Sequence, residues 1–571
     1  MTIRWGAATQ QASQPAAPAS GADLWRDAAA GLCVAGLLVP EAVAYAGLAH
    51  VPIGHALIAA LAGLLIYGLF GGSRFAVVSP TSSTATLSAA AVLSLPVAQG
   101  GGVDAAVFAQ ALAALVLLAG VALTVLGIAR QGQLSGFVSR PVLRGFSFAL
   151  AITIVIRQLP DALGLTLPRA ATGDPLHVLI YSATHAGDWH AASLAIALAT
   201  GAAMALLRRW PRLPGALIAM LLAIVAAQAL GLPARGVATV GHIDAPAFAP
   251  ALPALSVDEW LNAAELAFGV VVLVFAESWG SIRGLALAHN DHIDADRELR
   301  ALGLCNIGAA LLQGLPVGAG FSASNANAAA GAQTRLAGLI AFGAIVAAVL
   351  FALPGLALLP RPVLAVAVIG ALWHALSPAP LIGVWHMRRD RVLVVGAVAA
   401  VLAFGVLHGM LAAVGLSLVA ALRRFSRPVV HELGRLGATR NFVVIDAHSD
   451  ARALPGVLIL RPEEPLFFAS AERVANEVIA RVRQRDGVCS VVLSLEESSD
   501  LDSTAVECLI ELERRLARGG QTLLLARTKD KVRELLARCD PDGVGQQPHM
   551  TFSVADAVDA AGEVTGRSAQ P

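Results

Sequence analysis

The chain has 571 residues, of which 57% are hydrophobic and 14% are charged, and its formal net charge is +1. A soluble globular protein carries about 25% charged residues, so this composition predicts a chain that lies largely in a lipid bilayer. The sequence has no basic tract and no zinc-finger spacing, which argues against a nucleic-acid-binding protein. Its five cysteines form no C-x-x-C pair, so reduced thiols are expected rather than a disulfide framework.

The chain begins with a polar lead and continues as an almost unbroken series of apolar segments. Residues 1–22 are rich in Ala, Gln, Ser and Pro and predict a disordered cytoplasmic N-terminus without a signal peptide. Residues 23–426 predict a transmembrane transport domain. It holds about fourteen apolar segments, centred near residues 36, 62, 87, 116, 149, 194, 222, 270, 305, 327, 345, 369, 398 and 416.

Arginine is concentrated in alternate loops between these segments. Arg74, Arg140 and Arg144 fall in loops that would lie on one side of the membrane. The loops near residues 49–55 and 96–104, on the opposite side, have no Lys or Arg. Cytoplasmic loops of membrane proteins carry the excess of positive charge. The pattern predicts a multi-pass protein of a bacterial-type inner membrane, with both termini in the cytoplasm.

Two of the apolar segments are short and are preceded by Pro, Gly or Ser. They cover residues 79–95 and 321–332, and they are the third and tenth segments, seven apart. Interrupted helices at matching positions of two halves indicate a transporter's binding site, although kinked spanning helices are the alternative. Two helix N-termini with free N–H groups would attract an anion. The residues predicted to line this site are Ser79, Thr81, Ser82, Ser83, Gly320, Phe321, Ser322, Ala323, Ser324 and Asn325.

Two carboxylates lie inside apolar runs, where an ionised side chain is costly. Glu41 follows Pro40, and Glu277 lies four residues before Ser281, on the same helix face. Glu277 and Ser281 could supply oxygens to a sodium ion, or Glu277 alone could carry a proton. The alternative is a structural hydrogen bond between helices. We therefore predict Glu277, Ser281 and Glu41 as coupling-ion residues.

Other polar residues of this region are interpreted as structural. His289, Asp291, His292, Asp294 and Asp296 resemble a metal cluster at first sight, but they fall in a predicted cytoplasmic loop, and a solvated loop is expected. Asn327, two residues beyond Asn325, predicts a packing contact. We expect no bound metal and no cofactor apart from a transported Na⁺ or H⁺.

The last part of the chain alternates between short strands and helices. Residues 427–440 predict a linker, residues 441–560 a small α/β domain, and residues 561–571 a disordered tail. Strands are expected at 457–462, 488–495 and 521–526. Helices are expected to end near residues 485, 518 and 539. Asp502 and Ser503 stand where the second of these helices begins.

Several ordered motifs resemble the SulP anion-transporter family, the sulfate-permease group. They are residues 36–46, residues 67–74 with Ser79-Pro80-Thr81, residues 306–334 and residues 405–428. The tail is similar to a STAS domain, with Asp502-Ser503-Thr504 at its signature turn. The resemblance extends over almost the whole chain.

The resemblance implies fourteen segments in two inverted seven-helix repeats, a core and a gate domain, and an anion bound between the third and tenth helices. It also implies a homodimer, and its members carry sulfate, bicarbonate, chloride, oxalate or dicarboxylates. Glu277 and Ser281 match the carboxylate and hydroxyl of sodium-coupled members, and Glu277 also matches the carboxylate of proton-coupled members. Ala323 stands where many members have an arginine, which favours cation-coupled uptake.

Ser503 corresponds to the serine that is phosphorylated in stand-alone STAS regulators, and its alternative role is that of a plain helix cap. The STAS domain could also bind a cytoplasmic partner. The expected function is thus cation-coupled (Na⁺ or H⁺) symport of a small anion by alternating access. An exchanger or channel-like member of the same family, and a STAS-linked membrane sensor, are the alternatives. The sequence has no nucleophile–base constellation and no cofactor loop, so we do not expect an enzyme.

Overall fold

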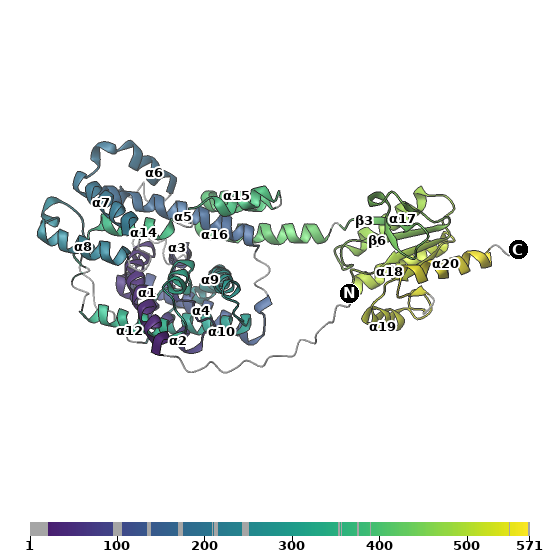
Figure 1. Ribbon diagram of the computed structural model, residues 1–571, viewed down its shortest axis with the longest axis horizontal. Helices are drawn as coiled ribbons and strands as arrows, with labels where there is room; N and C mark the ends of the chain where they lie inside the picture. Colours follow the sequence, from purple (N-terminus) through teal and green to yellow (C-terminus); the bar gives the residue numbers. More distant parts are fainter. Residues whose placement is uncertain are drawn as a thin grey trace. The chain divides into compact units, whose positions relative to one another are not determined.

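The chain is described by a computed structural model that covers residues 21–94, 105–133, 139–168, 175–207, 209, 215–241, 250–351, 355, 357–373, 376–388, 390–426, 428–546 and 549–568. Its internal contacts divide it into two compact units, Met1–Ser417 and Leu418–Pro571 (Figure 1). The first unit is helical, and the second contains a sheet covered by helices.

Most helices of the first unit coincide with predicted apolar segments, and the exceptions cover Pro175–Thr184 and Ala379–His386. Every predicted segment centre lies within one of the helices of this unit. They are α1 (Gly21–Leu48), α2 (Ile53–Phe70), α3 (Ser82–Ser94), α4 (Ala105–Ile128), α5 (Arg140–Leu163), α6 (Pro175–Thr184), α7 (Ala191–Leu207), α8 (Gly215–Ala229), α9 (Val257–Ala288), α10 (Ala295–Leu311), α11 (Phe321–Ala329), α12 (Leu336–Phe351), α14 (Arg361–Leu372), α15 (Ala379–His386) and α16 (Arg391–Phe425).

Length and composition separate these helices into two kinds. Five, within α1, α2, α4, α5 and α9, are long and apolar enough to cross a membrane, and others are apolar but shorter. The last two predicted segments lie in α16, where Gly405 has φ +78° and ψ 179° and interrupts the helix. A glycine adopts this conformation without the steric cost that a Cβ would bring. The polytopic helical architecture is confirmed, and the number of fourteen crossings stays a prediction.

The helices of the first unit form two groups. Helices α1, α2, α3, α4, α9, α10 and α12 gather in one, and α5, α7 and α14 pack together in another (Figure 1). Helices α4 and α10 lie especially close, because a Cβ on Gly120 would stand 2.7 Å from the Ile307 nitrogen, and one on Gly303 would stand 2.6 Å from the Thr124 nitrogen. Small residues permit such close helix packing in membranes.

Two three-residue strands precede the two short helices. Strand β1 (Val78–Pro80) leads into α3, and β2 (Val317–Ala319) leads into α11. They pair antiparallel, with Ser79 opposite Gly318. Because the strands run in opposite directions, the chain enters α3 from one end of the strand pair and α11 from the other end. This agrees with the inverted arrangement expected of the two halves.

Polar side chains hold this strand pair inside the helical unit. The Asn306 side chain of α10 donates to the Val317 carbonyl at 2.9 Å and accepts from the Val317 N–H at 3.0 Å. The Thr84 hydroxyl of α3 donates to the Pro316 carbonyl at 3.0 Å. Gly63 of α2 lets β1 approach, since a Cβ there would stand 2.5 Å from the Val78 carbonyl oxygen.

The second unit is a mixed sheet with helices on both faces. Its strand order is β4-β3-β6-β7-β8, with β5 also paired to β3. The strands are β3 (Val430–Leu436), β4 (Phe442–Val444), β5 (Ala451–Arg452), β6 (Val457–Pro462), β7 (Ser490–Ser494) and β8 (Thr522–Ala526). The helices are α17 (Ala471–Gln484), α18 (Ser503–Arg518), α19 (Asp530–Cys539) and α20 (Val554–Ser568).

Alternate residues of the central strands face opposite sides of this sheet. On β7, Val491 and Leu493 pack in the cluster with α17, α18 and α19, whereas Val492 packs in the cluster with α20. This is the period of two that a strand requires. The α/β domain is confirmed, but β3 occupies residues that the sequence assigned to a linker, and α20 extends into the predicted tail.

Candidate functional site

The start of α3 is closed by two threonines that bond to each other's backbone. The Thr81 N–H donates to the Thr84 hydroxyl at 3.0 Å, and the Thr84 N–H donates to the Thr81 hydroxyl at 3.2 Å. Side-chain oxygens thereby satisfy N–H groups at the start of the helix. Thr81, Ser82 and Ser83 are all buried, as is Ser79 in β1. Of the third-segment residues expected at the site, Thr81, Ser82 and Ser83 lie at the start of α3 and Ser79 lies in the strand before it.

Glu277 of α9 reaches this first turn. Its Oε2 accepts hydrogen bonds from the Ser83 hydroxyl at 2.8 Å and from the Thr81 hydroxyl at 3.3 Å. A carboxylate beside a helix N-terminus gains from the positive end of the helix dipole. The candidate coupling residue and the candidate anion site thus share hydrogen bonds.

The second short helix has a matching contact. The Ser322 hydroxyl, at the second position of α11, donates to Glu41 Oε1 of α1 at 3.3 Å. Ser83 is likewise the second residue of α3. Each short helix therefore presents a serine hydroxyl to a carboxylate from a long helix of the other half. This reciprocal pattern joins residues far apart in the sequence, so the sequence alone did not reveal it.

The two helix starts approach closely at Gly320. It precedes α11, and a Cβ there would stand 3.1 Å from the Thr81 Cγ2. Ala323 is buried, whereas the Phe321 side chain is 51% exposed. Position 323 consequently contributes no charge to the space around the two helix starts.

Other expected site residues of α11 make contacts elsewhere. The Ser324 hydroxyl accepts from the Val77 N–H at 3.1 Å, just before β1. The Asn325 amide donates to the Phe321 carbonyl of its own helix at 2.7 Å. Asn327 donates to the Phe75 carbonyl at 3.0 Å, which is the expected packing contact. Ser324 and Asn327 thus join α11 to the segment that leads into β1.

Two serines on α9 complete the neighbourhood of Glu277. The Ser278 hydroxyl accepts from the Ala319 N–H at 2.9 Å and holds the end of β2. Nothing in its apolar run distinguishes this serine, so it was not predicted. Ser281 is 1% exposed, and within the described residues its hydroxyl has no hydrogen-bond partner. Burying an unpaired hydroxyl costs free energy, so an oxygen-seeking cation would relieve this position.

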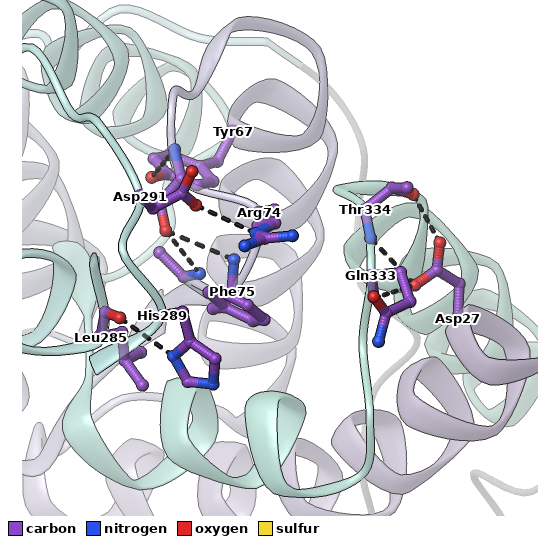
Figure 2. Close-up of polar contacts among 11 residues, drawn as sticks. Asp27, Tyr67, Arg74, Phe75, Leu285, His289, Asp291, Gln333 and Thr334 are labelled. Atoms are coloured by element: carbon purple, nitrogen blue, oxygen red, sulfur yellow. Dashed lines mark hydrogen bonds and ion pairs between the residues drawn. The ribbon is translucent and has the colours of Figure 1, made fainter. Parts of the chain in front are cut away.

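Figure 2 shows two further sets of polar contacts, one around Arg74 and Asp291 and one around Asp27. The Arg74 guanidinium pairs with Asp291 at 3.0 Å, and the Phe75 and His289 rings stand 4.3 Å apart between centroids. His289 Nδ1 bonds to the Leu285 carbonyl at 3.0 Å. His289, His292 and Asp294 are exposed, as expected of a solvated loop, and Asp291 and His289 in addition contact residues that precede β1. No group of three metal-binding side chains occurs in the described part of the chain.

Asp27 anchors the segment that follows α11. This carboxylate of α1 is fully buried, and it accepts from the Gln333 N–H at 2.6 Å and from the Thr334 N–H at 3.1 Å (Figure 2). The Thr334 hydroxyl also donates to it. A buried carboxylate is tolerated when several donors surround it. Both ends of α11 are consequently fixed to residues of the first half.

In the α/β unit, Asp502 rather than Ser503 makes the helix cap. Its Oδ1 accepts from the Ala505 N–H at 2.8 Å, and its Oδ2 accepts from the Phe468 N–H at 2.7 Å. Ser503 is exposed at the first position of α18. Any regulatory role for Ser503 stays a prediction.

A helical unit with several membrane-spanning-length helices and two short helices, followed by an α/β unit, is the architecture of a multi-pass membrane protein with a separate α/β domain. The chain belongs to the sulfate permease family, whose family model matches residues 24–398, and the STAS domain model matches residues 448–557. The resemblance seen in the motifs is thereby confirmed.

Relatives and solved structures agree with this assignment. A probable sulfate transporter of Mycobacterium tuberculosis is 33% identical over 538 residues, which cover 94% of each chain. The chloroplastic sulfate transporter 4.1 of Arabidopsis thaliana is 28% identical, over 90% of this chain and 76% of that one.

The murine Solute Carrier 26 family member A9 anion transporter, in its inward-facing state, superposes with a TM-score of 0.85 at 22% identity, over 95% of this chain and 92% of that one. The transmembrane domain of the cyanobacterial bicarbonate transporter BicA gives 0.59 at 22% identity, over 69% of this chain and 98% of that one. At these identities the superpositions establish the fold alone. The curated relatives are named as transporters, not as enzymes.

Proposed function

We propose that this protein is a cation-coupled symporter, which carries a small anion bound between the starts of α3 and α11. One observation carries the proposal: Glu277 accepts hydrogen bonds from Thr81 and Ser83, which belong to the first turn of α3. The anion and the coupling cation would therefore meet at the same helix N-terminus.

Electrostatics explains why the two would bind together. The N-termini of α3 and α11 attract an anion, but an ionised Glu277 beside them repels it. Two like unit charges about 4 Å apart repel by about 4 kcal/mol at the effective dielectric constant near a protein surface. A proton or a sodium ion on Glu277 removes this repulsion. Since Ala323 supplies no fixed positive charge, the cation is the group that compensates the anion.

The coupling cation is Na⁺ or H⁺. Sodium is favoured by the hydroxyls of Thr81 and Ser83, which bond the carboxylate. It is also favoured by the hydroxyl of Ser281, one turn along α9, which has no hydrogen-bond partner in the part of the chain that the structure describes. A proton needs Glu277 alone. Glu41 forms the equivalent pair with Ser322 at α11 and is proposed as a second residue that responds to the cation.

The proposed substrate is sulfate, bicarbonate or a dicarboxylate. The printed names of the relatives include sulfate transporters, and one structural neighbour is a bicarbonate transporter. The hydroxyl-rich start of α3 suits an oxyanion of this kind. The remaining site residues, Ser79, Ser82, Gly320 and Phe321, are proposed to shape the space between the helix starts.

We also propose an inner-membrane location with both termini in the cytoplasm, a homodimer, and a STAS domain that binds a cytoplasmic partner or is modified at Ser503. Transport domain and STAS domain are proposed to span residues 23–426 and 441–560. Fourteen crossings would give this placement of the termini, since an even number returns the chain to its starting side.

Uptake by proteoliposomes tests the proposal. Labelled sulfate, bicarbonate and fumarate would be offered separately under an inward Na⁺ gradient, an inward H⁺ gradient, or neither. Symport predicts accumulation of one anion under one gradient only. Uptake that ignores both gradients but rises with internal anion would instead identify an exchanger.

A further inference from the structure

Two arginines converge on one carbonyl oxygen at the C-terminal end of α2. Arg297 of α10 donates from Nη2 to the Gly71 oxygen at 2.9 Å. Arg335, which precedes α12, donates from Nη1 to the same oxygen at 2.6 Å. An arginine that bonds the last carbonyls of a helix is an ordinary cap. A second guanidinium on the same neutral atom is not, because it brings two positive charges together.

The carboxylate of Glu298 interacts electrostatically with Arg297, but it lies beyond ion-pair distance. Within the described residues, neither Arg297 nor Arg335 forms an ion pair. Glu298 lies next to Arg297, but its oxygens accept from the Tyr67 hydroxyl at 2.7 Å and from the Gly72 N–H at 2.8 Å. Asp291 is engaged by Arg74. Glu298, next to Arg297 in sequence, and Asp27, which bonds the residues just before Arg335, both accept from other donors, so each guanidinium keeps N–H groups that no carboxylate of the described residues contacts.

The two arginines also donate to the carbonyls of residues with exposed apolar side chains, Arg297 to Phe70 at 3.4 Å and Arg335 to Leu69 at 3.3 Å. Leu69 and Phe70, the last two residues of α2, are 56% and 54% exposed, and Leu336, directly after Arg335, is 39% exposed. A positive head with an apolar flank matches an amphiphilic anion. A small hydrophilic anion would gain nothing from contact with these apolar side chains.

We propose that Arg297 and Arg335 bind the phosphate of an acidic phospholipid, whose acyl chain lies along Leu69 and Phe70. The phosphate would bridge the two guanidiniums and offset their repulsion, as guanidinium–phosphate pairs do with strong hydrogen bonds. The lipid would then join α10 and the start of α12 to the end of α2, next to the segment that leads into β1. The proposal relies on the cytoplasmic placement of these loops, where the leaflet is anionic.

Lipid retention by the purified full-length protein tests this site. The protein would be equilibrated in mixed micelles that contain phosphatidylglycerol or phosphatidylcholine, and bound lipid would be counted by native mass spectrometry. The wild type should retain phosphatidylglycerol in preference to phosphatidylcholine. Arg297→Gln and Arg335→Gln should each weaken that retention about fivefold. Arg300→Gln is the matched control, because Arg300 is on the same helix but bonds its own backbone at Asp296.

The outcomes separate this site from the transport proposal. Equal retention of the two lipids by the wild type, or equal losses in all three variants, would overturn the lipid site. Displacement by millimolar inorganic phosphate without lipid selectivity would show a free-anion site and would also overturn it. The readout is binding alone, so failure of coupled uptake leaves it unaffected.

Discussion

At the scale of single residues, the two short helices share one feature, a hydrogen bond from a serine near the helix start to a carboxylate. The serine at the second position of each helix donates to a carboxylate on a long helix, Ser83 to Glu277 and Ser322 to Glu41. The sequence indicated both carboxylates, because acidic residues in apolar runs are rare and costly. It did not indicate their partners, since those hydroxyls are 194 and 281 residues away. An acidic residue in an apolar run can be recognised in the sequence, whereas its hydrogen-bond partner is known only from the folded structure.

Replacing Ser83 tests the link between Glu277 and α3. In Ser83→Ala, the carboxylate loses its 2.8 Å hydrogen bond. Hydrogen bonds to charged groups contribute about 1.5–3 kcal/mol, so the apparent affinity for the coupling cation should change about tenfold or more. Uptake rates measured against cation concentration would show it.

The matched control is Ser88→Ala, in the same helix, where the hydroxyl bonds the Ala85 carbonyl. It should leave the cation dependence unchanged. If both variants shift it equally, the Ser83 contact has no special role in coupling.

At the scale of elements, the sequence located the two short helices but not the strands that orient them. β1 and β2 have three residues each, too few for a recognisable alternation, and they are stabilised by side chains from α10 and α3. In the STAS domain, by contrast, the apolar patterns of the central strands and helices were sufficient to predict these elements. The sequence did not reveal the short edge strands β4 and β5 for the same reason as β1. Strand β3 has seven residues, but its burial does not alternate along the strand.

Asn306 should be among the residues most important to the strand pair. Asn306→Ala leaves both backbone groups of Val317 unpaired and buried. Each such group costs about 1–3 kcal/mol, so a marked fall in the thermal unfolding temperature is expected. Asn325→Ala, which removes an exposed bond within α11, should cause little change. Equal effects in a detergent-based unfolding assay would refute this account of β2.

Gly63 should be equally necessary where α2 meets β1. In Gly63→Ala, the new Cβ would stand 2.5 Å from the Val78 carbonyl oxygen, so backbone must shift. Overpacking of this kind costs about 1–3 kcal/mol. At Gly338 of α12 a Cβ would meet nothing within 4 Å, so Gly338→Ala is the control. Comparable unfolding temperatures for the two variants would contradict the close approach.

At the scale of the whole molecule, the chain is two units with separate hydrophobic cores. The STAS clusters contain no residue of the transport unit. Composition alone indicated this division, because charged residues become frequent near its boundary. The motifs also indicated the family. The pairing of α3 with α11 and the packing of loops around Arg74 depend on long-range contacts that no local pattern contains.

The STAS unit should fold by itself. A fragment of residues 428–568 is expected to unfold cooperatively and to shield Cys508. Burial, together with the charges of Glu472 and Glu511, raises the pKa of the Cys508 thiol. A raised pKa keeps the thiol protonated at mildly alkaline pH, where it reacts slowly. Maleimide at pH 8 should therefore label the exposed Cys489 and Cys539 first. Equal labelling rates before and after denaturation would show that the fragment is not folded.

Coupled uptake by the Glu277→Gln variant tests the central claim most directly. Wild type and variant would be reconstituted together with Ser88→Ala as a control, and uptake of the transported anion would be measured with and without the driving Na⁺ or H⁺ gradient. The account predicts that Glu277→Gln binds or equilibrates the anion but no longer accumulates it in response to the gradient. Accumulation that remains gradient-driven in this variant would contradict the assignment of Glu277 as the coupling residue.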